Sequence, residues 1–214
     1  MTPIARRVTG LAVVVLLATA ASTVAMMHAR PAAAQASVAT KTFANEHYRY
    51  TVALPAGCRH EEGPGTVDAV CSGDLDPERS AQVSNATALV MEVSAEIVAG
   101  DVGKSSTDLA LAYGEATFRD ELPEAICGES DRTRANIANV TQTVQDARLM
   151  YAADVTCAEV KFLQIGERRA LVRYIIGPDA RYRLVARAPT DDFARQKQAI
   201  EAFFDSFQVL PARK

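Results

Sequence analysis

All four cysteines of this chain follow a segment that has the features of an export signal: Cys58, Cys71, Cys127 and Cys157. That segment, residues 1–36, begins with Arg6 and Arg7, continues through an apolar run at 11–18 and ends in Ala34-Gln35-Ala36. A basic start, an apolar middle and a small-x-small exit are the three parts of a signal peptide. An even number of cysteines after such a signal predicts disulfides in an oxidising compartment. We therefore expect cleavage near Ala36 and a mature protein that is periplasmic or secreted.

The apolar part of this leader leaves one alternative open. Residues 8–27 carry no charge, and a bilayer span takes about 20 apolar residues. The segment would then be kept as an anchor. Pro31 and the small-residue exit behind it favour cleavage, and after cleavage we expect no stable membrane span.

Length and charge restrict the function classes. Residues 37–214 are enough for a single domain with a substantial core. The leader holds three of the 23 basic residues and none of the 26 acidic ones, which leaves 20 against 26 and a formal charge of −6. A mildly acidic domain has no global attraction for nucleic acid. The mature part has no Trp and, of His, only His47 and His60, so we predict neither a cofactor nor a metal site.

Alternation of apolar and polar residues predicts most of the strands. The pattern covers residues 48–54, 66–72, 89–97 and 149–157. Residues 134–146 fit either a helix or a strand; we favour a strand because Thr141 and Thr143 lie among β-branched neighbours. Residues 56–65 are rich in Gly and residues 73–86 are polar, so we predict turns and loops there.

Two segments have helical periodicity. The first begins near Ser105, where Ser105 and Asp108 resemble a capping box, and it should stop or kink at Pro123, with Gly128 just beyond its last turn. The second follows Thr190 as N-cap and gathers four Phe, which should make it a principal core element. Strands, helix, strands and helix joined by short connections predict one α+β domain over 37–214, with a mostly antiparallel sheet flanked by helices.

The segment around Pro178 predicts a hairpin with a defined register. One apolar set lies at even positions from Ala170 to Ile176 and another at even positions from Tyr182 to Ala188. If both sets share one core face, Ile176 pairs with an even-numbered residue and the connection has three or five residues. Four arginines then share the opposite face: Arg169, Arg173, Arg183 and Arg187. Such a face is a candidate site for an envelope protein or an anionic ligand; a solvated or salt-bridged face is the alternative.

Four cysteines allow three pairings. We favour Cys58 with Cys71, which would cross-link a hairpin, and Cys127 with Cys157, which would join a helix end to the inward face of a strand. No Cys-x-x-Cys motif is present to lower a thiol pKa, and no pair has the short spacing of zinc ligands. Both bridges are therefore predicted to be structural.

Two stretches are typical of a known family. Residues 48–55 (YRYTVALP) form a strand that ends in proline, and residues 182–189 (YRLVARAP) precede a helix and the ending FDSFQV at 204–209. These stretches resemble the opening strand, closing strand, helix and ending of PsbP-like domains, the extrinsic photosystem II subunit and its relatives. The resemblance implies an antiparallel sheet flanked by helices, a PsbP-like α/β sandwich, and a group that is mainly non-enzymatic and acts through protein contacts. Gly57-Cys58 stands where relatives often have Gly-Trp, and the two disulfides indicate a bacterial exported branch.

No motif supports a catalytic assignment. Gly128-Glu129-Ser130 lacks the second Gly of a nucleophile elbow, and the acidic segment 74–78 lacks the Gly and Glu that a calcium loop requires. Our first hypothesis is an exported, non-enzymatic binding or assembly module of the cell envelope. The alternative is a hydrolase-like or other enzyme whose site consists of scattered Asp, Glu and Ser.

Overall fold

The computed structural model of this protein describes residues 39–71, 89–128, 134–161 and 164–211. Residues 37–214 form one compact unit. The predicted signal peptide at 1–36 and the predicted loop at 73–86 lie outside the described residues, and both remain predictions. Within the described residues, no helix is long and apolar enough to cross a membrane.

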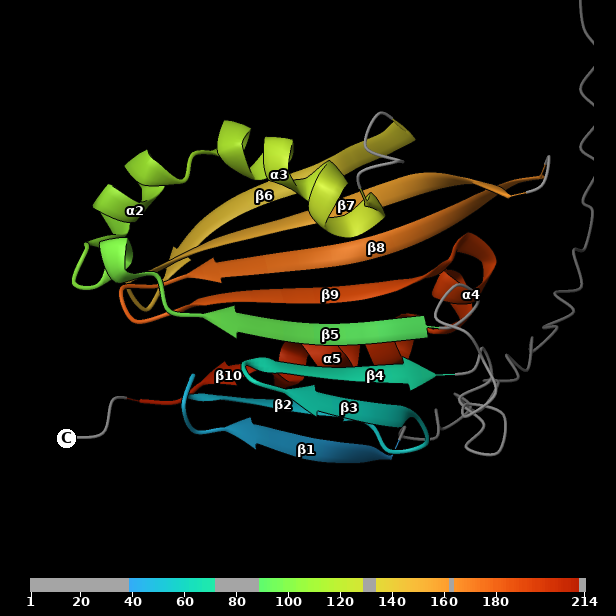
Figure 1. Ribbon diagram of the computed structural model, residues 1–214, viewed down its shortest axis with the longest axis horizontal. Coiled ribbons are helices and arrows are strands. Elements are labelled where there is room, and N and C mark those ends of the chain that lie inside the picture. Colours follow the sequence, from blue (N-terminus) through green and yellow to red (C-terminus); the bar gives the residue numbers. More distant parts are fainter. Residues whose placement is uncertain (1–38, 72–88, 129–133, 162–163, 212–214) are drawn as a thin grey trace, which may run out of the picture. The chain divides into compact units, whose positions relative to one another are not determined.

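Seven antiparallel strands form the larger sheet, in the order β3-β4-β5-β9-β8-β7-β6 (Figure 1). Their bounds are β3 Arg59–Gly63, β4 Thr66–Cys71, β5 Leu89–Glu96, β6 Ala135–Gln145, β7 Arg148–Lys161, β8 Gln164–Ile176 and β9 Arg181–Pro189. A smaller antiparallel sheet has the order β1-β2-β10, with bounds β1 Thr40–Asn45, β2 Tyr50–Pro55 and β10 Gln208–Val209. The predicted α+β class with a mostly antiparallel sheet is confirmed.

Helices cover both faces of the larger sheet. One face packs against α2 (Ser106–Ala112) and α3 (Glu115–Cys127), which follow the short 3₁₀ helix η1 (Ala99–Asp101), and we call it the α3 face. The opposite face, the α5 face, packs against α4 (Thr190–Arg195), α5 (Lys197–Ser206) and the smaller sheet. Figure 1 shows α2 and α3 over the β6–β8 half of the sheet and α5 behind β4 and β5.

Each face has its own hydrophobic core. On the α5 face, Leu54 of β2, Leu184 of β9 and Phe203 of α5 belong to one buried cluster. On the α3 face, Leu122 of α3 and Val155 of β7 belong to a second. A sheet that is buried on both faces lets apolar residues occupy both sides of a strand, and this property decides the register of the β8–β9 hairpin.

The predicted register of the β8–β9 hairpin is wrong. Ile176 pairs with Arg181, and the connection 177–180 has four residues rather than three or five. Tyr182 therefore pairs with Ile175, and the even-numbered residues of β9 lie on the α5 face. The even-numbered residues of β8 lie on the α3 face, as Val172 does. The two apolar sets belong to different cores, so the assumption of one shared core face fails.

The predicted helices exist with different ends. Ser105 caps α2 in a full capping box with Asp108, but the helix ends at Ala112 and a second helix starts after Gly114. That second helix, α3, continues through Pro123 to Cys127, because the buried side chains that flank the proline hold it on the sheet. The C-terminal segment forms α4 and α5, and Pro189 rather than Thr190 occupies the N-cap position. Of the predicted apolar stripe, Phe193, Ile200, Phe203 and Phe204 are buried, whereas Phe207 lies just beyond α5 and is partly buried.

The strand predictions are largely confirmed, including residues 134–146 as strand β6. Residues 56–65 contain the strand β3 as well as the predicted turns. The sequence does not predict this strand, because it is a mostly exposed edge strand and lacks apolar alternation. Both predicted disulfides are present, Cys58–Cys71 and Cys127–Cys157, with Cα–Cα distances of 4.5 and 5.5 Å. The first links the start of β3 to the end of β4, and the second links the end of α3 to β7.

Candidate functional site

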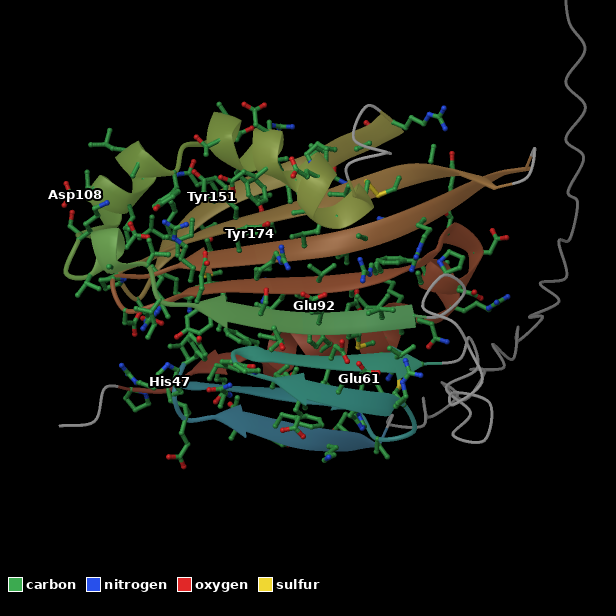
Figure 2. All side chains as sticks on the ribbon, in the orientation of Figure 1. His47, Glu61, Glu92, Asp108, Tyr151 and Tyr174 are labelled. Carbon is green, nitrogen blue, oxygen red and sulfur yellow. A yellow bond between two sulfur atoms is a disulfide. The ribbon has the colours of Figure 1, made fainter. Side chains whose placement is uncertain are left out.

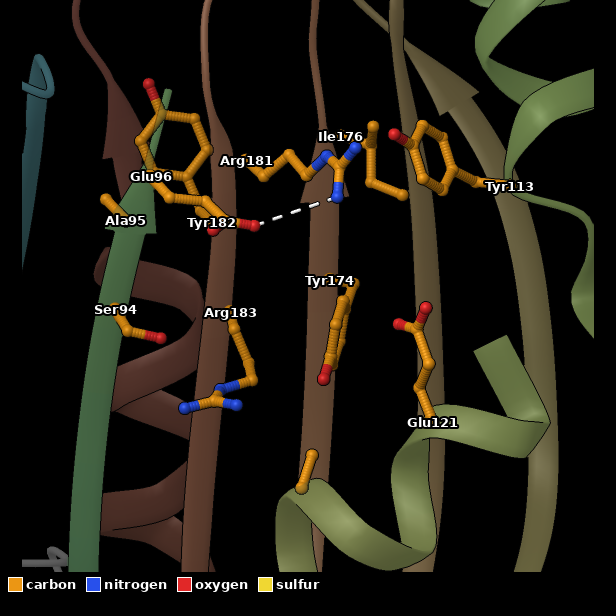
Figure 3. Close-up of a pocket in the computed structure, with 11 residues that line it drawn as sticks. Ser94, Ala95, Glu96, Tyr113, Glu121, Tyr174, Ile176, Arg181, Tyr182 and Arg183 are labelled. Carbon is orange, nitrogen blue, oxygen red and sulfur yellow. Dashed lines mark ion pairs between the residues drawn. The ribbon is translucent and has the colours of Figure 1, made fainter. Parts of the chain in front are cut away.

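A groove runs along β8 and β9 beside α3, on the α3 face. Its larger part is a cavity of about 430 Å³ whose walls come from β5, β8, β9, the α2–α3 junction and α3: Ser94, Ala95, Glu96, Tyr113, Glu121, Ala125, Tyr174, Ile176, Arg181, Tyr182 and Arg183. Figure 3 shows the side chains of Tyr174 and Arg183 side by side, with Glu121 reaching from α3 on the other side. Polar and aromatic groups therefore dominate the centre of this cavity.

Arg181 is held in place at one end of the groove by a buried acid. Its Nε donates to the Oδ2 of Asp101 at 2.8 Å, and the Asp101 side chain is only 3% exposed. Asp101 also accepts from Tyr113 at 3.1 Å and from Lys104 at 3.2 Å. The guanidinium lies 4.0 Å from the centre of the Tyr113 ring, and Glu96 lies 3.7 Å from its Nη1 (Figure 3). This arginine is fixed and its charge is compensated.

Arg183 occupies the middle of the groove. Its Nη2 donates to Glu92 at 3.1 Å, and its Nε is buried without a hydrogen-bond partner. Burial disfavours the charged form of Arg183, but Tyr174 and Glu92 beside it raise its pKa, so the guanidinium stays charged. Burial also raises the pKa of Tyr174. Figure 2 marks Tyr174 and Glu92 on this side of the sheet.

The smaller part of the groove lies at the end of α3. It is a cavity of about 250 Å³ around the Cys127–Cys157 disulfide, with walls from Glu124, Gly128, Arg168, Ala170 and Arg187 among others. Ala125 borders both cavities, so they adjoin. Gly128 follows α3 with a φ of 84°, a conformation that glycine adopts without strain.

Arg187 differs from the other arginines of β9. Among the described residues it has neither a hydrogen-bond partner nor an ion-pair partner, and its Nε is buried. Its neighbour across the strand pair is Ala170, so Arg168 lies diagonally beside it on the same face. Three arginines, Arg168, Arg169 and Arg187, therefore border the smaller cavity, and among the described residues Arg187 has no ion-pair partner.

One carboxyl group on the α3 face has a perturbed pKa. Burial raises the pKa of Asp68 on β4, and repulsion from Glu61 and Glu92 on the neighbouring strands adds to the effect. Asp68 faces Glu92 directly in the strand register. It borders neither cavity. The described residues contain no group of three or more His, Cys, Asp or Glu that is placed to hold a metal ion.

The four predicted arginines do not share a face. Arg183 and Arg187 lie on the α3 face and line the groove. The strand register places Arg169 and Arg173 on the α5 face, although Arg169 also borders the smaller cavity. Arg169 pairs with Asp154 at 3.0 Å and lies over Phe193. The prediction that the four arginines share one face is therefore wrong, and their role in binding a partner stays a prediction. The wrong register caused the error, since it placed odd positions of both strands on one side.

Sequence reasoning missed two members of the groove. The alternation places Tyr174 in the apolar core set, and it gives Arg181 no role. Their signal was present in the strand pattern, because Arg181 and Arg183 continue the odd-numbered series of β9 that ends at Arg187. The residues singled out at 74–78 and at Glu129 and Ser130 lie outside the described residues.

Comparisons with known proteins identify the fold. No family model and no curated protein matches this sequence. The solution structure of cyanobacterial PsbP (CyanoP) from Synechocystis sp. PCC 6803 superposes with a TM-score of 0.50 at 14% identity, covering 80% of this chain and 93% of that one. Two further structures have lower TM-scores. A crystal structure from Bacteroides thetaiotaomicron has a TM-score of 0.41 at 15% identity and covers 81% of this chain and 48% of that one. A Pseudomonas aeruginosa protein of unknown function has a TM-score of 0.42 at 8% identity and covers 82% of this chain and 99% of that one. The chain therefore has a PsbP-like fold.

Proposed function

We propose that this protein is an exported, non-enzymatic binding module of the cell envelope, and that its groove holds an anionic group of a partner. The observation that carries the proposal is Arg187, whose guanidinium has no ion-pair partner among the described residues and borders a cavity that adjoins a larger one. Guanidinium groups bind carboxylates and phosphates through paired, charge-assisted hydrogen bonds. An anionic group in the smaller cavity supplies an ion-pair partner for Arg187, which has none among the described residues.

The other groove arginines support a role in binding. Arg181 and Arg183 are already held by acids, so they require no reordering when a partner arrives. At about 3.3 Å per residue, the row from Arg181 to Arg187 extends over about 20 Å. A row of this length fits an extended acidic segment of a protein rather than a single small anion.

The enzymatic alternative has less support. A hydrolase needs convergent acid and base groups in a cavity, with pKa values pushed apart. Asp68 has a raised pKa, but it borders neither cavity, and its neighbour Glu92 is paired with Arg183. The described residues thus favour binding over acid–base chemistry.

Export is part of the proposal. The two disulfides agree with an oxidising compartment, because such bonds persist in the periplasm and outside cells and are rare in the cytosol. The predicted signal peptide at 1–36 would bring the chain there.

The test uses a defined acidic probe, an extended peptide of aspartates, and measures its dissociation constant by calorimetry. Arg187→Gln should weaken binding about tenfold, the effect of losing about 1.4 kcal/mol. Arg119→Gln is the matched control, since it removes the same charge from an exposed position on α3, where Arg119 pairs with Glu115. Equal losses in both variants would reduce the interaction to general charge attraction and contradict a specific site.

A further inference from the structure

Strand β6 is the edge of the larger sheet, and it carries no charged residue. Its eleven residues are Ala, Asn, Ile, Val, Thr and Gln only. The opposite edge, β3, carries Arg59, Glu61 and Glu62, and the outer strand β1 of the smaller sheet carries Lys41. Of the two edge strands of the larger sheet, β6 is therefore the uncharged one.

Edge strands present unpaired N–H and C=O groups, and proteins normally protect them with charges, prolines or bulges. Of these devices β6 has the bulge alone. The register with β7 shifts between Ala138 and Thr141, where Asn139 has a φ of 52° and donates to Asp154. Beyond the bulge, Thr141–Gln145 pairs regularly with β7 and is exposed throughout.

The exposed run includes an apolar side chain. Val144 is 56% exposed, although it faces the same side of the sheet as the buried Leu149. Within the described residues, β7 is the only strand that pairs with β6. The outer edge of Thr141–Gln145 thus combines free backbone groups, β-branched residues and no charge.

We propose that this edge pairs with the same edge of a second copy of the chain. The two strands run antiparallel about a two-fold axis at Thr143, so that Thr143 faces its own counterpart and Gln142 faces Val144 of the other copy. Such an axis is perpendicular to the sheet, which continues from one copy into the next with both α3 faces on the same side.

The distribution of charge points to β6 as the place where two copies of the chain can meet. Two mature chains of formal charge −6 repel each other over most of their surfaces. Along β6 no like charges meet in any register. The strand also offers no charge by which to select a different acidic or basic segment. A contact of five residues on each side is small, so the dimer is of the weak, reversible class.

Sedimentation of the native, disulfide-bonded protein tests the proposal. The average mass should rise towards that of a dimer as the concentration approaches about 1 mM. Thr143→Lys places two ammonium groups on the axis and should abolish this rise. Thr42→Lys, the same change on the exposed edge strand β1, should leave it intact.

Cross-linking provides a second measurement that needs no change in charge. Thr143→Cys should form a disulfide between copies at high concentration, whereas Thr42→Cys should not. A monomer at every concentration overturns the proposal, and so does a dimer that survives Thr143→Lys. Protection of the β6 amides from hydrogen exchange only in the presence of a different protein would also overturn it, in favour of a foreign strand. Each result is independent of the probe binding by Arg187.

Discussion

The Nη1 of Arg173 donates a hydrogen bond to the carbonyl oxygen of Phe204, 3.0 Å away, and the guanidinium lies over the same residue's ring at 5.2 Å. Phe204 is in the last turn of α5, where backbone carbonyls have no intrahelical donors. Arg173 therefore joins β8 to the C-terminal end of α5 and places a positive charge where the helix dipole favours it. Its role on the α5 face is structural.

Loss of this link should destabilise the fold. Arg173→Met keeps most of the apolar stem but removes the charge and the hydrogen bond, and we expect the free energy of unfolding to fall by about 2 kcal/mol. Urea unfolding at unchanged m-value measures it. Arg195→Met, at a position with a 65% exposed side chain in α4, should change the value by less than about 0.5 kcal/mol. An unchanged midpoint for Arg173→Met would contradict the assigned role.

Replacement of Asp101 should lower the free energy of unfolding more than replacement of an exposed acid. Its buried carboxylate accepts from Arg181, Lys104 and Tyr113, so it joins the η1–α2 segment to β9. Asp101→Asn removes the buried counter-charge of Lys104 and leaves Arg181 with the more distant Glu96 alone, and we expect a loss of about 3 kcal/mol. Thermal unfolding measures it. Asp120→Asn, at an exposed position of α3, serves as control and should have almost no effect; equal losses would argue against a special role for Asp101.

Much of the fold was predictable from the sequence because local pattern and tertiary packing agree there. Alternation in β5 and β7 places Met91 and Tyr151 in the cores where the pattern expects them. The capping box at Ser105 is a local device and forms as its residues predict. The two disulfides join elements whose order and direction the strand pattern already indicated.

The groove was not predictable from the sequence, because the sheet has a core on each face. The position of the groove depends on which side chains of each strand enter which of the two cores. Alternation shows that Val172 and Leu184 are both inward, but it does not show that they enter different cores. A sheet covered on both faces removes the constraint that a single core would impose. The continuation of α3 through Pro123 is likewise a tertiary effect, since packing on β7 outweighs local propensity. The helix break at Gly114 instead agrees with the low helix propensity of glycine.

The β6–β7 turn offers a stabilising substitution. The two residues between paired Gln145 and Arg148 are Asp146 and Ala147, with φ of 50° and 60°. Positive φ at both positions is typical of a type I′ hairpin turn, which favours glycine at the second one. Ala147→Gly should raise the free energy of unfolding by about 0.5–1 kcal/mol, since relief of the left-handed strain exceeds the entropy that glycine adds to the unfolded chain.

A glycine placed within a strand of the same hairpin should instead lower the free energy of unfolding. Ala152→Gly, within the regular part of β7, should lower the free energy of unfolding by about 0.5–1 kcal/mol. Both variants are compared by urea unfolding with the parent protein. Destabilisation by both would show that the turn gains nothing from glycine.

Tyr182 makes stability dependent on pH in the alkaline range. Its buried hydroxyl donates to the carbonyl oxygen of Tyr48 at 2.8 Å, and burial, together with the charge of Asp179, raises its pKa from 10.0 to about 12. Below pH 10 the hydroxyl is protonated in both the folded and the unfolded chain, so its contribution is fully present. Above that pH the unfolded chain releases the proton first, and the contribution is lost as the pH rises through about 12.

Urea unfolding at a series of pH values from about 9 to about 11 measures this decline. Tyr182→Phe should be less stable than the parent at the lower end, by about 1 kcal/mol, because the hydrogen bond to Tyr48 is missing. Its stability should then fall less steeply with pH, because the phenylalanine has no proton to release. Parallel declines in the two proteins would place the alkaline sensitivity in other groups and contradict the assignment to Tyr182.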